Sequence, residues 1–237
     1  MKSFLKDSSL IFIILLGFVS NSNSQKADKS DVGGLLYFPL QISDVKEGVD
    51  DKMGDHQNRW YSRHLASMNE PVLFDKTNEN LKVFRYTNLG SDNNPYTIRI
   101  ELIDSIVILN YKLTDGKGGY GTGKIIKEFQ KQLPIAEWNR ILAKVESTHF
   151  WNIHSFRRFI EDGVEIMNLD GAEWIFEGLI EDKYHFVTRN TPESTDDKDY
   201  ASLCNLLYEY FLVIDKEATR EATRKNDPHL VNFKLKI

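Results

Sequence analysis

Residues 172–189 read AEWIFEGLIEDKYHFVTR and contain two aromatic-rich apolar runs on either side of the charged triplet Glu181-Asp182-Lys183. Both runs have the length and the content of β-branched and aromatic residues that are typical of β-strands. The short charged connection between them is suited to a tight chain reversal. The stretch therefore predicts a β-hairpin, and with it a fold built on an antiparallel sheet.

The register of this hairpin decides which side chains share a face. If all three residues of the triplet form the loop, Ile180 lies opposite Tyr184 and the large aromatic residues gather on one face. A two-residue loop, Asp182-Lys183, would instead divide the aromatic residues between the two faces. Burial of an aromatic side chain contributes about 1.5–3 kcal/mol, so we predict the three-residue loop.

The predicted register places Glu177, His185 and Arg189 together on the opposite face of the hairpin. We consider three roles for them. They can form a structural network of ion pairs and hydrogen bonds. They can form a recognition surface in which Arg189 binds a carboxylate or phosphate. Alternatively, His185 can act as a general acid or base, with its basicity raised by Glu177.

No nucleophile accompanies these three residues, so catalysis has the weakest support. Glu177 and His185 are the only catalytic candidates. The binding candidates are Glu177, His185, Arg189 and Trp174, all on the same hairpin.

The rest of the chain predicts an α+β domain in which an antiparallel sheet packs against two main helices. Strands are expected at residues 81–86, 96–102 and 106–113, with Asp104-Ser105 as the turn between the last two. Residues 124–133 fit a strand or a helix equally well. Helical patterns cover residues 134–145 and 197–216, and a shorter one at residues 60–68 ends before Pro71.

The N-terminus carries an apolar run, LIFIILLGFV at residues 10–19, preceded by Lys2 and Lys6. Ten residues are too few to span a bilayer as a helix, which needs about twenty. The pattern is typical of a secretory signal peptide cleaved before Gln25. We therefore expect export to the periplasm or the outside, and no membrane span in the mature chain.

These patterns divide the chain into four parts. Residues 1–24 are the expected signal peptide, and residues 25–57 are a polar linker in which residues 35–42 (LLYFPLQI) can dock as a strand. Residues 58–216 form the single α+β domain, and residues 217–237 form a charged C-terminal extension.

Composition excludes several classes of function. The chain has 30 basic and 35 acidic residues and a net charge of −5, which argues against nucleic-acid binding. Its single cysteine, Cys204, excludes an internal disulfide and a cysteine-based zinc cluster, and its apolar neighbours predict a buried thiol.

Two further patterns resemble cofactor or metal motifs but do not satisfy them. Residues 118–124 (GGYGTGK) resemble part of a phosphate-binding loop, but Ile125 stands where a Mg²⁺-binding Ser or Thr is needed. His149 and His154 are five residues apart, which is not the spacing of a helical metal pair. We therefore expect no cofactor and no metal.

A longer pattern runs from Asp170 to Pro192. It consists of D-G-x-x-W-x-x-E-G at residues 170–178, Y-H-x-V-x-R at residues 184–189, and the nearby proline. Together with Tyr61-Ser62, Gly119-Tyr120, Trp138 and Phe150-Trp151, it resembles a family of uncharacterised exported bacterial proteins.

The resemblance covers residues 60–192 and implies no established activity. The chain departs from the pattern at Asn190-Thr191, where Trp and Ser are common in the family. A ligand contact made by that Trp would be lost or changed here.

These features favour an exported, soluble binding or interaction module of the bacterial cell envelope, with an unknown protein or small-molecule partner. One alternative is a small hydrolase or sugar-processing enzyme that uses Glu177 and His185, with Asp170 nearby. A pocket shared by both side chains would favour the enzyme, and a flat polar patch would favour binding.

A third possibility is a structural accessory protein that docks through its C-terminal helix. It predicts an exposed apolar stripe from Leu206 to Ile214.

Overall fold

The computed structural model describes residues 34–39, 55–77, 79–156, 160–161, 164–165, 171–194 and 197–226. Six strands form one sheet in the order β4-β3-β2-β1-β7-β8, and every neighbouring pair is antiparallel. Their bounds are β1 Lys82–Gly90, β2 Tyr96–Ile103, β3 Ile106–Thr114, β4 Ile125–Leu133, β7 Ala172–Ile180 and β8 Lys183–Asn190. A separate pair, β5 Ile160–Glu161 and β6 Val164–Glu165, lies outside this sheet.

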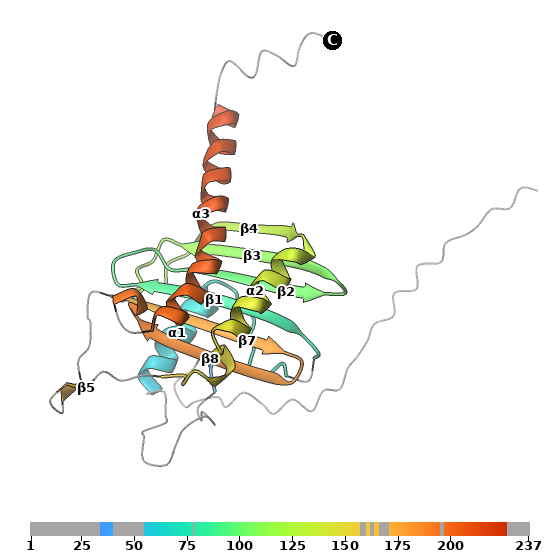
Figure 1. Ribbon diagram of the computed structural model, residues 1–237. Helices are drawn as coiled ribbons and strands as arrows, with labels where there is room; N and C mark the ends of the chain where they lie inside the picture. The colour runs from blue at the N-terminus through green and yellow to red at the C-terminus, as the bar shows by residue number, and fades with distance from the viewer. Residues whose placement is uncertain are drawn as a thin grey trace, which may run out of the picture.

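Helices cover both faces of the sheet. Helices α2 (Ile135–Ser147) and α3 (Lys198–Asn226) lie across one face, while α1 (Asp55–Ser67) lies behind the other (Figure 1). We call these the α2–α3 face and the α1 face. Two short 3₁₀ helices, η1 (Phe150–Asn152) and η2 (Pro192–Ser194), precede β5 and α3. The predicted class, an α+β fold with an antiparallel sheet and two main packed helices, is confirmed.

The β2–β3 turn forms where the sequence predicts it. Ile103 pairs with Ile106, so Asp104 and Ser105 are the two loop residues, and both have positive φ angles, of 47° and 70°. Positive φ at both central residues defines the type I′ turn that matches the twist of a hairpin. The ambiguous segment at residues 124–133 is strand β4, an edge strand with mostly polar side chains.

The predicted register of the β7–β8 hairpin is wrong by one residue. Ile180 pairs with Lys183, so the loop is Glu181-Asp182, and Phe176 lies opposite Val187. The aromatic residues are therefore divided between the faces. Trp174 and Phe176 belong to the core beneath α2 and α3, whereas Phe186 belongs to the core beneath α1. Because both faces of this hairpin are buried, dividing the apolar residues buries more of them than gathering them on one face.

Helix α3 also differs from its prediction. It continues to Asn226 instead of ending near Lys216, and it extends past the β4 edge of the sheet (Figure 1). Leu206 and Leu207 are buried, because this part of the helix packs on the sheet. The predicted exposed apolar stripe is therefore wrong at these residues, and the exposed apolar side chains of α3 are Leu212 and Val213, among those that the structure describes. The side chain of Ile214 lies outside the described part of the chain.

Two predictions concern the N-terminal region and the membrane. The expected signal peptide, residues 1–24, lies outside the described residues. Residues 35–42 are described only as far as Pro39, and there the segment docks without pairing as a strand. Within the part of the chain that the structure describes, no helix combines the length and the apolar composition needed to cross a bilayer.

Gly178 provides a test of the β7 register. It pairs with Phe84 and His185, and an added Cβ would lie 2.8 Å from the Phe150 ring and 3.1 Å from the Trp151 ring. We expect Gly178→Ala to lower the free energy of unfolding by about 1–3 kcal/mol in urea titration, because the site is already filled. Gly121→Ala is the matched control, since no atom lies within 4 Å of its added Cβ. Equal losses for the two variants would contradict this packing.

Candidate functional site

The structure separates the three polar residues that the sequence brings together. Glu177 pairs with Phe186 and lies on the α1 face, whereas His185 and Arg189 lie on the α2–α3 face. The separation follows from the register, because a shift of one residue moves every side chain of a strand to the other face. The predicted trio is therefore not formed.

His185 has a packing role on its face. Its Nε2 atom donates a hydrogen bond to the carbonyl oxygen of Ile153 at 2.8 Å. Its ring contacts the rings of Phe150 and Trp151, with centroid distances of 5.0 and 6.4 Å. These contacts fix the half-buried imidazole against the segment that follows α2.

Arg189 and Trp174 are also used internally. The Arg189 guanidinium donates to Asp197 at 3.1 Å and to the carbonyl oxygens of His154 and Ser155 at 2.8 and 3.2 Å. This arrangement ties β8 to the chain on either side of it. Trp174 packs edge-on against Tyr86 in the core. Neither side chain is presented to solvent as a recognition group.

Glu177 forms a buried ion pair with Arg85 on the neighbouring strand. The two residues are direct cross-strand partners, and both are fully buried. Nε and Nη2 of Arg85 each donate to one carboxylate oxygen of Glu177 at 2.7 Å, which is the bidentate geometry of a strong pair. The Tyr184 hydroxyl donates a further hydrogen bond to Glu177 at 3.0 Å.

On its other side Arg85 faces a like charge. Its cross-strand partner on β2 is Arg99, and two cations in this position repel each other. Glu70 lies between them, and its Oε2 atom accepts from Arg99 at 2.8 Å and from Arg85 at 3.4 Å. Its Oε1 atom lies 3.0 Å from the Lys112 ammonium. One buried carboxylate therefore holds three cations together.

The end of α1 explains how Glu70 reaches this position. Asn69 has a φ of 51°, the amide of Glu70 bonds to the carbonyl of Leu65, and the amide of Asn69 bonds to that of Ala66. These are the two hydrogen bonds of a Schellman motif, in which Asn is one of the few residues that tolerates the left-handed conformation. The motif ends the helix and directs the Glu70 side chain into the sheet.

The charges around Glu70 determine its protonation. Burial raises the pKa of Glu70, but the nearby charges of Arg85, Arg99 and Lys112 outweigh burial, so the pKa lies below its usual value. Burial, followed by the charge of Glu177, raises the pKa of Tyr184 well above its usual value. Glu70 therefore stays ionised and Tyr184 stays a neutral donor at neutral pH.

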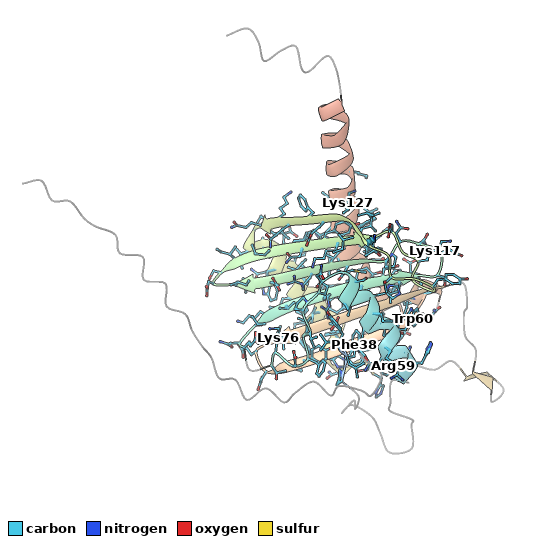
Figure 2. All side chains as sticks on the ribbon, turned by 180° about the vertical axis from the view of Figure 1, so that it is seen from behind. Phe38, Arg59, Trp60, Lys76, Lys117 and Lys127 are labelled. Carbon is cyan, nitrogen blue, oxygen red and sulfur yellow. The ribbon has the colours of Figure 1, made fainter. Side chains whose placement is uncertain are left out.

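From this network a row of hydrogen-bonded polar side chains runs toward the β4 edge. Arg99 also pairs with Glu101, Asn110 donates to Glu101 at 3.5 Å, and Gln130 donates to Asn110 at 3.0 Å. Gln130 and the two side chains next to it on the same face of β4 are exposed. We call the α1-face surface of β2, β3 and β4 the open half. In Figure 2 strands β3 and β4 lie clear of α1 on this face.

Sequence analysis missed Glu70, Arg85 and Arg99. The sequence contains a signal for Arg85. All residues of β1 after Lys82 are buried, and Arg85 is the one charged residue among them. A charge in a strand buried on both faces requires a partner, and Glu177 is the carboxylate that the β1–β7 register places opposite it. Glu70 offered no such signal, because its position depends on the end of a helix distant from the sheet.

The glycine-rich loop has a structural role. The amide of Gly118 bonds to the carbonyl of Gly90 at 2.9 Å, and a Cβ on Gly118 would lie 2.4 Å from the backbone of Leu89. The Gly118 carbonyl accepts hydrogen bonds from Trp60 Nε1 at 2.7 Å and from His64 Nε2 at 3.0 Å. The loop therefore fastens α1 to the end of β1.

The described residues also form a hollow on the α2–α3 face. A shallow groove of about 570 Å³ lies between α2 and α3, and it is lined by Arg140, Ala143, Lys144, Ser147, Ser202, Asn205, Leu206 and Glu209. The Arg140 guanidinium there pairs with Glu209 at 2.6 Å. Among the described residues, no three His, Cys, Asp or Glu side chains gather closely enough to bind a metal ion. Cys204 is fully buried, as predicted, and burial raises the pKa of its thiol.

No protein-family model matches the sequence, and a search of curated proteins finds no significant match. The resemblance of residues 60–192 to uncharacterised exported bacterial proteins therefore stays a prediction.

The buried pair leads to a prediction about stability. We expect Glu177→Gln to lower the free energy of unfolding by about 3–5 kcal/mol, because it leaves the Arg85 charge buried without its bidentate partner. Lys76→Ala, which removes an exposed pair with Glu79, should cost less than about 1 kcal/mol. Urea titration of both variants measures the difference. A loss for Glu177→Gln no larger than for Lys76→Ala would show that the pair is not buried.

His64 leads to a prediction about pH. Burial lowers its pKa to about 4, against an opposing hydrogen bond to Gly118. Between about pH 6.5 and pH 4 the unfolded chain therefore binds a proton that the folded chain excludes, so the free energy of unfolding falls as pH falls. The loss across this window is on the order of 3 kcal/mol.

His64→Gln keeps an N–H donor but does not titrate, so its stability should depend less on pH in this window. Parallel profiles for His64→Gln and the parent, measured by thermal unfolding at fixed ionic strength, would contradict the assignment.

Proposed function

We propose that this protein is an exported binding or interaction module of the bacterial cell envelope that acts through the open half of its α1 face. Export is supported by the signal-peptide pattern at residues 10–24. Binding rather than catalysis is supported by how the polar side chains are used. Those with reactive chemistry are paired inside the fold, while the open half carries exposed polar side chains on β4 and half-buried ones on β2 and β3.

The open half has the properties of a recognition surface. Its central side chains, Arg99, Glu101, Asn110 and Gln130, are already held by one another. Side chains that are ordered before binding lose little conformational entropy when a partner docks. Three exposed isoleucines, Ile103, Ile106 and Ile126, lie at the margins of the same face and offer apolar contact area. This observation carries the proposal.

The hydrolase alternative has less support. Glu177 and His185 lie on opposite faces of the sheet, so one substrate cannot contact both. Glu177 is fully buried against Arg85, and His185 donates to the carbonyl of Ile153. Asp170, the third residue of that alternative, lies outside the described residues.

A second candidate is docking through α3. One observation favours it: Leu212 and Val213, which follow the last core-packed residue Phe211, are 41% and 53% exposed, and α3 extends past the sheet (Figure 1). Two adjacent apolar residues on a protruding helix suit a protein partner. This candidate uses a different surface from the open half, so one experiment can separate the two.

Photo-crosslinking in the native host tests both candidates. A photoreactive amino acid replaces Gln132 on the open half, Val213 on α3, or the exposed Glu146 on α2 as the control. We expect a discrete crosslinked species from Gln132 and none from Glu146, detected by immunoblotting of the envelope fraction. A species from Val213 alone would support α3 docking. Equal labelling at all three positions, or none at Gln132 and Val213, would contradict an interaction module.

Export is the control for the same experiment. Ile13→Asp with Leu15→Asp introduces two charges into the apolar run, which blocks its insertion. The altered chain should keep residues 1–24, remain in the cytoplasm and give no Gln132 crosslink. The parent should begin at Gln25 when its N-terminus is sequenced.

A further inference from the structure

Residues 34–39 lie on the α1 face, against α1 and strands β7 and β8. Leu36, Tyr37 and Phe38 are almost completely buried, although none of them pairs with a strand. We call residues 36–38 the docked segment. It lies in a groove between α1 and the β7–β8 part of the sheet, and Figure 2 shows Phe38 beside α1.

The docked segment is recognised through its backbone by two buried polar side chains of α1. Asn58 Nδ2 donates to the Phe38 carbonyl at 3.0 Å, and the Tyr37 amide donates to Ser62 Oγ at 2.9 Å. Ser62 Oγ in turn donates to Asn58 Oδ1 at 3.1 Å, so the two side chains hold each other in position. Asn58 and Ser62 are four residues apart and therefore share one helical face.

This arrangement differs from ordinary core packing. A buried amide or hydroxyl without a partner costs about 1–3 kcal/mol, so Asn58 and Ser62 require a peptide backbone in the groove. They contact the N–H of Tyr37 and the C=O of Phe38, where the backbone bends, and these groups are present in any peptide. The side chains of α1 thus bind the backbone of the segment through one donor and one acceptor.

Specificity comes from the two aromatic side chains. The Phe38 ring packs against Phe186 at a centroid distance of 5.1 Å and against Tyr61 at 5.9 Å. The Tyr37 hydroxyl donates to the carbonyl of Glu70 at 2.8 Å. A ligand for this groove is therefore a peptide with adjacent Tyr and Phe residues that bends at this pair.

The groove does not depend on the docked segment for its walls. Trp60 and His64 fasten α1 to Gly118, and the Tyr61 hydroxyl shares a hydrogen bond with Thr188 on β8 at 3.2 Å. These contacts place α1 on the sheet without any atom of residues 34–39. The walls therefore persist when the segment leaves, which is the condition for exchange.

The chain between the segment and α1 is long enough to reach another molecule. Fifteen residues, 40–54, separate Pro39 from Asp55. At about 3.3–3.6 Å per residue they can span roughly 50 Å, which exceeds the width of a domain of this size.

We propose that the groove is a peptide-binding site, which the chain fills with its own docked segment and which accepts the same segment from a second copy. This site is separate from the open half, so it stands independently of the function proposed above. Exchange of the segment between two copies joins them without any new type of contact.

The test uses the intact mature chain with a specific protease site placed within residues 40–54. After the folded protein is cut, the docked segment is held by non-covalent contacts alone. A fluorescent synthetic peptide of residues 32–42 is then added, and its binding is followed by anisotropy. We expect the labelled peptide to replace the cut segment and to be displaced by unlabelled peptide.

Variants are made in the peptide only, so the protein itself remains unchanged. Phe38→Ala should weaken binding roughly a hundredfold or more, because it empties an aromatic pocket. Leu35→Ala is the matched control and should bind like the parent, because Leu35 is 53% exposed. No exchange of the peptide, or equal binding of the Phe38→Ala peptide, would overturn the proposal.

A second experiment tests whether the docked segment can come from a second copy of the chain. Uncut chains with two different tags are refolded together at high protein concentration, and mixed dimers are isolated by sequential affinity steps. We expect mixed dimers in the parent and far fewer when Ser62→Ala weakens the groove in both chains. Uncut chains that remain monomeric at every concentration would overturn the second copy as an occupant.

Discussion

The structure depends on one constraint: strands β1, β7 and β8 are covered on both faces. A strand in this position has no solvent-facing side, so its polar side chains need partners inside the fold. The bidentate Arg85–Glu177 pair is the largest consequence, since it joins β1 to β7 across the middle of the sheet. The division of the aromatic residues between the two cores is another. Beyond these strands, the same face becomes less buried toward the edge, and Glu128, Gln130 and Gln132 on β4 are exposed.

Much of the fold could be predicted from the sequence because its signals are local. The strand patterns between residues 81 and 113, the Asp104-Ser105 turn and the two main helices each depend on neighbouring residues, and the structure contains all of them. The β7–β8 register was wrong because it depends on what lies behind the sheet. The three-residue loop was predicted for a hairpin with one buried face. In the structure, α1 and residues 36–38 bury the second face as well. Nothing in the sequence of residues 172–189 indicates that this second face is covered.

The candidate site could be predicted less well, for a related reason. His185, Arg189 and Trp174 attract attention as residue types, but their roles are set by partners far away in the chain, such as Ile153 for His185 and His154 for Arg189. Conversely, Arg99, Asn110 and Gln130 look like ordinary polar positions of strands. They form a row only because β2, β3 and β4 are adjacent, and the row runs from the half-buried Arg99 and Asn110 to the exposed Gln130. Which part of a sheet is covered is a property of the tertiary structure.

The end of α1 connects the two surfaces on this face. Its Schellman motif presents the carbonyl of Glu70 to the Tyr37 hydroxyl and its carboxylate to Arg85, Arg99 and Lys112. The peptide groove and the open half are thus joined through a single residue. If the segment in the groove is exchanged, the hydrogen bond from Tyr37 to the Glu70 carbonyl is broken and formed again. The contacts of the Glu70 carboxylate meanwhile keep the row of hydrogen-bonded side chains of the open half in place. The geometry therefore allows the groove to change its occupant without disordering the open half, because three cations hold Glu70 from the other side.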